Sequence, residues 1–180
     1  MSAEQALELL KEGNARYVAG KLSPKDNYDE IRSSLSEGQN PFAVILCCAD
    51  SRVAPEIYFD QKLGDIFVIR NAGNVVDDVV MGSIEYGAEH LGCPLVAVVG
   101  HTHCGAVTAA VEGGEAPKNV GEIIKRIIPS IAEGRSIDEV ACVNAEAMVE
   151  EIRNDEIIKE LNVKVVAAVY DIETGEVSWH

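Results

Sequence analysis

Apolar and polar positions divide most of the chain into short continuous apolar runs and longer stretches with helical spacing. Apolar runs bounded by turn-forming residues predict buried strands at 42–47, 66–69, 95–99 and 163–170. Apolar positions three or four residues apart predict helices at 79–91, 107–111, 120–131 and 137–161. Near-continuous apolar strands are typical of parallel sheets covered on both faces. The alternation therefore predicts a three-layer α/β fold around a mainly parallel central β-sheet.

The two ends of the chain extend this plan. Ser2 and Gln5 have the spacing of a capping box, and an apolar stripe follows that predicts an amphipathic helix needing a surface to pack on. A second short helix is expected at 28–35. A turn at 173–175 predicts a hairpin whose last strand forms an antiparallel edge of the sheet.

No repeat or long linker separates two parts of the sequence. We therefore expect a single domain over residues 1–180, with an N-terminal helical arm at 1–36 and an α/β core at 42–180.

Composition and charge narrow the classes of function. The 180 residues are 47% hydrophobic and 25% charged, which is typical of a globular protein. Fifteen Lys and Arg against thirty Asp and Glu give a net charge of −15, so we expect no nucleic-acid partner, because such binding relies on clustered basic side chains. No apolar run approaches the roughly 18 residues of a membrane span, so we expect no membrane contact.

The cysteines and the first residues bear on the compartment. The first residues are acidic and do not form a basic start before an apolar stretch, so we expect a cytoplasmic location rather than a secretory signal. Five cysteines, an odd number with irregular spacing, do not form a disulfide framework. We assign Cys47, Cys93 and Cys142 to the core and treat the other two as candidate metal ligands.

Polar side chains follow two of the predicted strands where those strands end. Cys48 follows the first strand, and His101 and Cys104, in His-x-x-Cys spacing, follow the third. Parallel sheets present their chemistry beyond the carboxyl ends of the strands, so these side chains should share one rim. Two thiolates and one imidazole are a tetrahedral Zn²⁺ ligand set with one open position. The alternative is that the cysteines are small buried hydrophobic residues and the histidine a core residue, and spacing alone leaves both open.

Asp50 and Arg52 follow Cys48 directly. An ordinary surface ion pair is one interpretation. Beside a metal, however, a bidentate guanidinium would hold the carboxylate away from the open coordination position and leave that position to water.

These segments together resemble the β-class carbonic anhydrases. The resemblance rests on residues 48–52 (CADSR), 70–74 (RNAGN) and 100–105 (GHTHCG), and it extends from about Ser2 to the end of the chain. It implies one Zn²⁺ per chain on Cys48, His101 and Cys104 and a catalytic Asp50–Arg52 dyad. It also implies reversible hydration of CO₂ to bicarbonate and a proton.

The resemblance also implies a substrate pocket and a partner. Gln39, Phe67 and Tyr86 match pocket positions of the plant-like members, whereas Ala72 replaces a branched aliphatic residue of that pocket. A solvated loop amide and ordinary core aromatics are the alternatives for these positions. In the family the pocket is made across a dimer contact, so a homodimer or a dimer of dimers is expected.

Two other functions stay open at this stage. The same site could hydrolyse carbonyl sulfide or carbon disulfide, which are linear electrophiles like CO₂. Alternatively, Asp50 as a permanent fourth ligand would make the chain a non-catalytic zinc-binding module.

Overall fold

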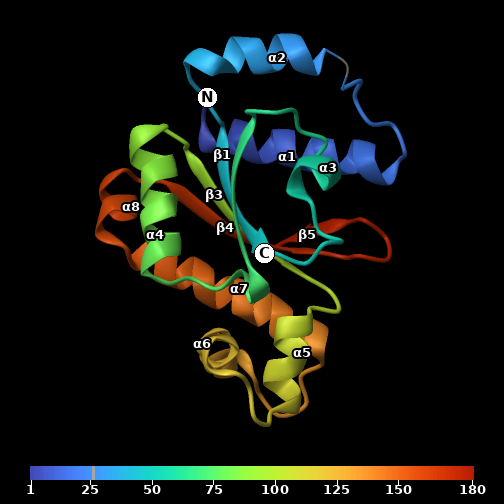
Figure 1. Ribbon diagram of the computed structural model, residues 1–180, viewed down its shortest axis with the longest axis vertical. Helices are drawn as coiled ribbons and strands as arrows, with labels where there is room; N and C mark the ends of the chain where they lie inside the picture. Colours follow the sequence, from blue (N-terminus) through green and yellow to red (C-terminus); the bar gives the residue numbers. More distant parts are fainter. Residues whose placement is uncertain (26) are drawn as a thin grey trace.

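The computed structural model describes residues 1–25 and 27–180. A five-stranded sheet with the strand order β2-β1-β3-β4-β5 forms its centre (Figure 1). The strands are β1 (Ala43–Cys48), β2 (Ile66–Asn71), β3 (Leu95–His101), β4 (Lys164–Tyr170) and β5 (Val177–Trp179). β1 lies parallel to both β2 and β3, β3 lies parallel to β4, and β5 pairs antiparallel with β4. The mainly parallel sheet with an antiparallel edge is therefore confirmed.

The α-helices of the described residues are α1 (Ala3–Val18), α2 (Tyr28–Ser34), α3 (Pro55–Tyr58), α4 (Asp78–Glu85), α5 (Gly105–Glu112), α6 (Lys118–Ile127), α7 (Ile137–Asn154) and α8 (Glu156–Glu160). Several of them cover the two faces of the sheet. Successive strand side chains point to opposite faces. Ile45 and Cys47 accordingly pack in the core under α1 and α3, whereas Leu46 and Cys48 pack in the core under α4 and α7.

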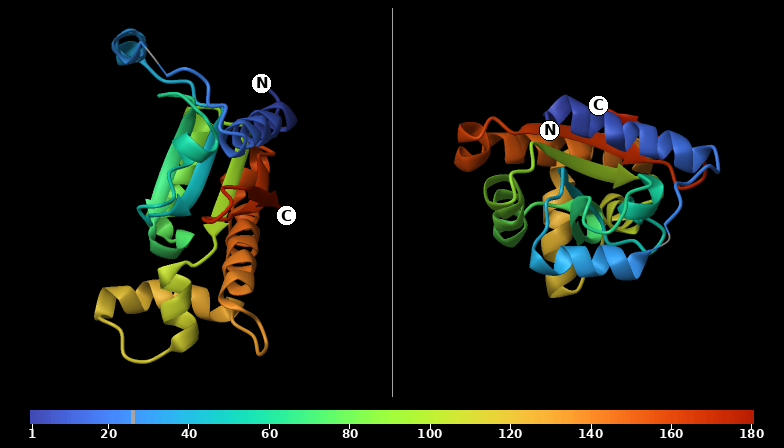
Figure 2. Two further views of the ribbon diagram at one scale, coloured as in Figure 1. Left: turned by 90° about the vertical axis from the view of Figure 1, so that its right-hand side faces the viewer. Right: turned by 90° about the horizontal axis from the view of Figure 1, so that it is seen from above.

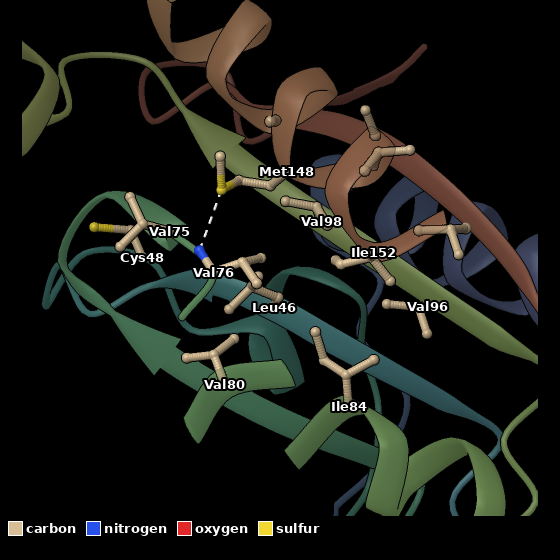
Figure 3. Close-up of a cluster of buried hydrophobic side chains, with 14 of the residues drawn as sticks. Leu46, Cys48, Val75, Val76, Val80, Ile84, Val96, Val98, Met148 and Ile152 are labelled. Carbon is tan, nitrogen blue, oxygen red and sulfur yellow. Dashed lines mark hydrogen bonds between the residues drawn. The ribbon is translucent and has the colours of Figure 1, made fainter. Parts of the chain in front are cut away.

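The core under α4 and α7 reaches the carboxyl end of β1. Figure 3 shows part of it, with Val96 and Val98 of β3 beside Met148 and Ile152 of α7. Cys48 lies at the margin of this group, next to Val75. The apolar packing thus fixes the end of β1 from which the polar loop begins.

The N-terminal segment contains two helices that differ in burial. The capping box of Ser2 and Gln5 starts α1, which buries Ala6 and Leu10 against the chain's own sheet. No side chain of α2 is buried, and α2 stands apart from the sheet (Figure 2). The division into an arm and a core stays a prediction.

The structure corrects several details of the sequence prediction. The helix expected at 137–161 breaks at Asp155, whose backbone is extended and whose side chain caps α8. The helix expected at 79–91 is α4 followed by a π-helical turn at Tyr86–His90. The pattern of apolar positions does not predict α3, which is four residues long. The assignment of Cys142 to the core is wrong, since its side chain is only partly covered.

Among the residues that the structure describes, no helix combines the length and the apolar composition needed to cross a membrane.

Candidate metal centre

Three side chains from separate parts of the chain meet at one end of the sheet. Cys48 is the last residue of β1, His101 is the last residue of β3, and Cys104 is the N-cap residue of α5. One potential ligand atom from each lies within 4.8 Å of the other two. All three side chains are buried. The parallel arrangement of β1 and β3 therefore produces the shared rim that the sequence predicts.

The His101 ring has one nitrogen that the protein satisfies and one that it does not. Nδ1 lies 2.8 Å from the Thr102 carbonyl oxygen, and because a carbonyl only accepts, Nδ1 carries the hydrogen. Nε2 is buried and finds no hydrogen-bond partner among the described residues. A histidine that ligates a metal through Nε2 uses this arrangement, in which the second nitrogen fixes the ring. The unpartnered Nε2 therefore fits a metal ligand.

The two thiols cannot both ionise easily without a cation. The hydrogen bond from the Cys104 thiol lowers the pKa of Cys48, and the adjacent Cys48 sulfur together with burial raises the pKa of Cys104. Two neighbouring thiolates repel each other, and a divalent cation removes that cost. Two sulfurs and an imidazole are a ligand set that Zn²⁺ favours. The residues present thus fit a zinc ion.

Asp50 is not part of this cluster although it is two residues from Cys48. Arg52 Nε donates to Asp50 Oδ1 at 3.0 Å, and Arg52 Nη2 donates to Oδ2 at 2.8 Å. The backbone N–H of Arg52 also donates to Oδ1, at 2.9 Å. The Arg52 hydrogen bonds hold the pKa of Asp50 well below its usual range. The carboxylate is therefore charged and fixed beside the three ligand side chains.

Other strands and loops hold this dyad in place. Arg70 of β2 donates through Nε to the Cys48 carbonyl at 3.0 Å and through Nη2 to the Asp50 carbonyl at 2.7 Å. Arg52 Nη2 donates to the His103 carbonyl at 3.2 Å, and the His103 N–H donates to Asp138 of α7 at 2.8 Å. Both sides of the Asp50 loop are thus tied to regular structure.

A second chain of contacts supports Cys48 from α7. The buried Asn144 side chain donates through Nδ2 to the Gly73 carbonyl at 2.9 Å. The Gly73 N–H in turn donates to the Cys48 sulfur at 3.4 Å. Gly73 has a φ of 76°, which favours glycine, and a Cβ there would lie 2.9 Å from Ile127 Cδ1. Position 73 therefore requires a glycine.

Sequence reasoning did not identify Arg70, Asp138 or Asn144 as supports of the site. Asn144 did leave a signal, because it is a polar residue on the otherwise apolar buried face of α7. Arg70 lies opposite Cys47 in the register between β1 and β2, which places it beside the end of β1. The pattern of apolar residues does not predict the register between β1 and β2.

The expected pocket residues do not join the cluster within one chain. Phe67 lies opposite Val44 in the β1–β2 register, and a strand advances about 3.3 Å per residue, so Phe67 is roughly 13 Å along the strand from Cys48. The rings of Phe67 and Tyr86 lie 6.1 Å apart by their centroids. Gln39 is an exposed residue before β1. Phe67 and Tyr86 thus lie toward the amino ends of β1 and β2 rather than beside the metal centre.

Comparison with known proteins places this site in a family context. The family described as "Carbonic anhydrase" matches residues 43–177. A curated carbonic anhydrase of Mycolicibacterium smegmatis is 51% identical over 134 residues, which are 72% of this chain and 65% of that protein. Carbonic anhydrase 2 of Mycobacterium tuberculosis is 49% identical over the same shares. The chain thus spans less than two thirds of the length of these relatives.

Solved structures share the fold. A crystal structure described as one of two tetrameric β-carbonic anhydrases from Sordaria macrospora superposes with a TM-score of 0.78. It is 22% identical and covers 97% of this chain and 96% of its own. A β-carbonic anhydrase from Coccomyxa in complex with acetazolamide gives a TM-score of 0.75 at 28% identity, over 84% of this chain and 77% of its own.

Proposed function

The chain belongs to the carbonic anhydrase family, in its β class, and from this premise we propose that it catalyses the reversible hydration of CO₂ to bicarbonate and a proton. The observation that carries the proposal is the buried group of Cys48, His101 and Cys104 beside a carboxylate that Arg52 holds. This arrangement combines a zinc-type ligand set with an acceptor that stays outside the set.

We infer that the three residues hold one Zn²⁺ per chain. The unpartnered Nε2 of His101 and the two sulfurs support this inference. Bound there, the ion would supply the Lewis acidity that makes a water molecule a stronger nucleophile.

Asp50 has one hydrogen-bonding position left for a reacting water. A carboxylate offers about four lone-pair positions, two on each oxygen. Arg52 N and Nε occupy both positions on Oδ1, and Arg52 Nη2 occupies one on Oδ2. The remaining position on Oδ2 accepts a hydrogen bond from the attacking water and so orients its lone pair toward CO₂. Because the pKa of Asp50 is lowered, the carboxylate accepts this bond and does not donate one.

The same geometry argues against one of the two alternative functions. A non-catalytic zinc module needs a fourth protein ligand, and the bidentate contact with Arg52 keeps Asp50 from that role. Carbonyl sulfide and carbon disulfide would meet the same residues, so turnover of the three substrates must be compared directly.

We further infer that a second copy of the chain completes the pocket. Tyr86 is 45% exposed, although it packs beside Phe67, so this surface is available for a partner. The Sordaria macrospora relatives are described as tetrameric. A homodimer or a dimer of dimers would place Gln39, Phe67 and Tyr86 of one copy near the metal centre of another.

We also infer a cytoplasmic location. Its support is that the five cysteines are free thiols.

The test measures CO₂ hydration by stopped flow with a pH indicator, alongside the zinc content of the same preparation. Zinc-loaded protein should hydrate CO₂ faster than it hydrolyses carbonyl sulfide or carbon disulfide. A preparation with a full complement of zinc and no hydration activity would contradict the proposal.

A further inference from the structure

A second group of metal-ligating side chains lies on the outer part of the α7 layer, away from the proposed zinc centre. Cys142 and Glu146 are one turn apart on α7, and His180 follows β5. One potential ligand atom from each lies within 4.8 Å of the other two. We propose that Cys142, Glu146 and His180 form a second binding site for a transition-metal ion of the Zn²⁺ type.

The distances between these atoms are close to those that a shared ion requires. Zn–S and Zn–N bonds of about 2.3 and 2.0 Å in a tetrahedron separate the two ligand atoms by about 3.5 Å. The Cys142 sulfur lies 3.8 Å from His180 Nδ1. Glu146 Oε1 lies 4.0 Å from the Cys142 sulfur and 4.0 Å from His180 Nδ1. Glu146 and His180 are exposed, so rotation about their side-chain bonds can shorten these distances.

The backbone of each contributor is held by regular structure. Cys142 and Glu146 belong to the long helix α7, which packs on β3 and β4. The His180 N–H donates to the Ala167 carbonyl of β4 at 3.0 Å, which continues the β4–β5 ladder by one residue. Trp179 packs on the opposite face, so strand alternation turns His180 toward α7.

The surroundings tolerate a cation. Glu146 and His180 border a hollow of about 350 Å³, so water can reach this side of the three residues. Arg153 also borders this hollow, but its guanidinium donates to Glu150 at 2.7 Å and to the Val165 carbonyl at 2.7 Å. The positive charge of Arg153 is therefore neutralised by a neighbour outside the site.

A metal site accounts for these residues better than a nucleophilic one. Burial, followed by the nearby Glu146 charge, raises the pKa of the Cys142 thiol, so little thiolate is present without a cation. Cys142 also lies within a helix, where the backbone N–H groups are used by the helix and cannot stabilise an oxyanion. Sulfur as a ligand excludes Mg²⁺ and Ca²⁺ and favours Zn²⁺ or Co²⁺.

The first test uses Cys142 as its own reporter. The other four cysteines are buried, so iodoacetamide should modify Cys142 in the folded protein, as read by peptide mass spectrometry. Zn²⁺ should slow this modification about tenfold or more, because the bound thiolate is no longer a free nucleophile, and Mg²⁺ should not. Glu146→Gln and His180→Ala should each reduce the protection by Zn²⁺. Glu151→Gln, on the same helix but paired with Arg126, is the matched control and should keep it.

The second test counts ions. Equilibrium dialysis against Zn²⁺ should give one more bound ion per chain in the wild-type protein than in Cys142→Ser. This difference should persist in a Cys48→Ser background, so it is independent of the proposed carbonic anhydrase site. Equal zinc contents, or alkylation of Cys142 that Zn²⁺ does not slow, would overturn the proposal. Protection in His180→Ala that equals the wild type would overturn it as well.

Discussion

Arg52 forms a bidentate pair with Asp50, in which Nε donates to Oδ1 at 3.0 Å and Nη2 donates to Oδ2 at 2.8 Å. The Arg52 side chain is 53% exposed and the Asp50 side chain 18% exposed, so Arg52 lies on the solvent side of the pair. A contact of this geometry fixes the direction of the carboxylate, which a single hydrogen bond would not do.

Replacing Arg52 should therefore stop catalysis and leave metal binding intact. Arg52→Ala is expected to lose about 10²-fold or more in kcat/KM, because Asp50 no longer has a fixed orientation. Arg52→Lys should not restore the rate, since an ammonium cannot make both contacts. The measurements are stopped-flow hydration and zinc content. Arg32→Ala, which breaks an exposed pair with Asp29, is the control. Wild-type turnover in Arg52→Ala would show that the dyad has no role.

The neighbouring cysteines Cys47 and Cys48 should behave differently. Cys48→Ser is expected to abolish activity and the binding of zinc at the carbonic anhydrase site, because a hydroxyl does not replace a thiolate ligand. Cys47→Ala, one residue earlier but on the opposite face of the sheet, should keep its zinc. The free energy of unfolding of Cys47→Ala should be about 1 kcal/mol lower than that of the wild type, as expected for a small loss of core packing. Zinc content measured after dialysis separates the two variants, and equal contents would contradict the assignment of Cys48 as a ligand.

Removing Asn144 should reveal the support that α7 gives to the site. Asn144→Ala leaves the Gly73 carbonyl without its hydrogen bond and is expected to lower the free energy of unfolding by about 1–3 kcal/mol. Urea denaturation measures this change. Asn154→Ala, whose side chain donates to the Glu150 carbonyl at the exposed end of the same helix, should cost less. If Asn154→Ala lowered the free energy of unfolding more than Asn144→Ala does, the hydrogen bond from Asn144 to Gly73 would not be an important support of the site.

Asp60 should make the stability depend on pH in the acid range. Burial alone would raise the pKa of this carboxyl, but hydrogen bonds from Arg16 and Ser23 outweigh it and lower the pKa to about 2. Since the unfolded value is about 3.9, the stabilisation is complete above that pH and is lost as the pH falls through about 2. At neutral pH the free energy of unfolding of the wild type should exceed that of Asp60→Asn by about 2 kcal/mol. This difference should disappear in acid.

Urea denaturation over this pH range measures the gap directly. Asp29→Asn, at an exposed ion pair, is the control and should show a small difference. A gap between wild type and Asp60→Asn that stays constant down to about pH 2 would contradict the role given to Asp60.

The proposed dimeric pocket can be tested by complementation. Tyr86→Ala should lose activity through the pocket, and Cys48→Ser should lose it through the metal. If the pocket is made by two copies, a mixed dimer joins an intact metal centre from one chain with an intact Tyr86 from the other. Co-expression of the two variants should then recover activity, measured after purification with two different affinity tags. Activity no greater than the sum of the two parents would place Tyr86 and the metal in the same chain's site.

The sequence predicts the sheet well because each buried strand is an uninterrupted apolar run. The same pattern places Cys48 and His101 at strand ends. Because β1 and β3 are parallel neighbours, these two ends lie side by side. The break at Asp155 was missed because apolar residues continue with helical spacing on both sides of it. Asp155 is a good N-cap residue, but only its extended backbone shows that a new helix starts there. The contacts of Asn144 and Arg70 depend on packing between distant segments, which local patterns do not reveal.

The candidate ligand Cys48 lies far from His101 and Cys104 in the sequence, and this affects when the newly synthesised protein can bind its metal ion. Cys48 and Cys104 are separated in the chain by the whole of β2 and α4, and they meet only after β1 and β3 have paired. A nascent polypeptide on the ribosome would therefore not bind the ion with all three ligands until residue 104 has emerged and both strands are aligned. Metal binding would then report the pairing of β1 with β3, and the ion would stabilise a strand arrangement that it did not help to nucleate.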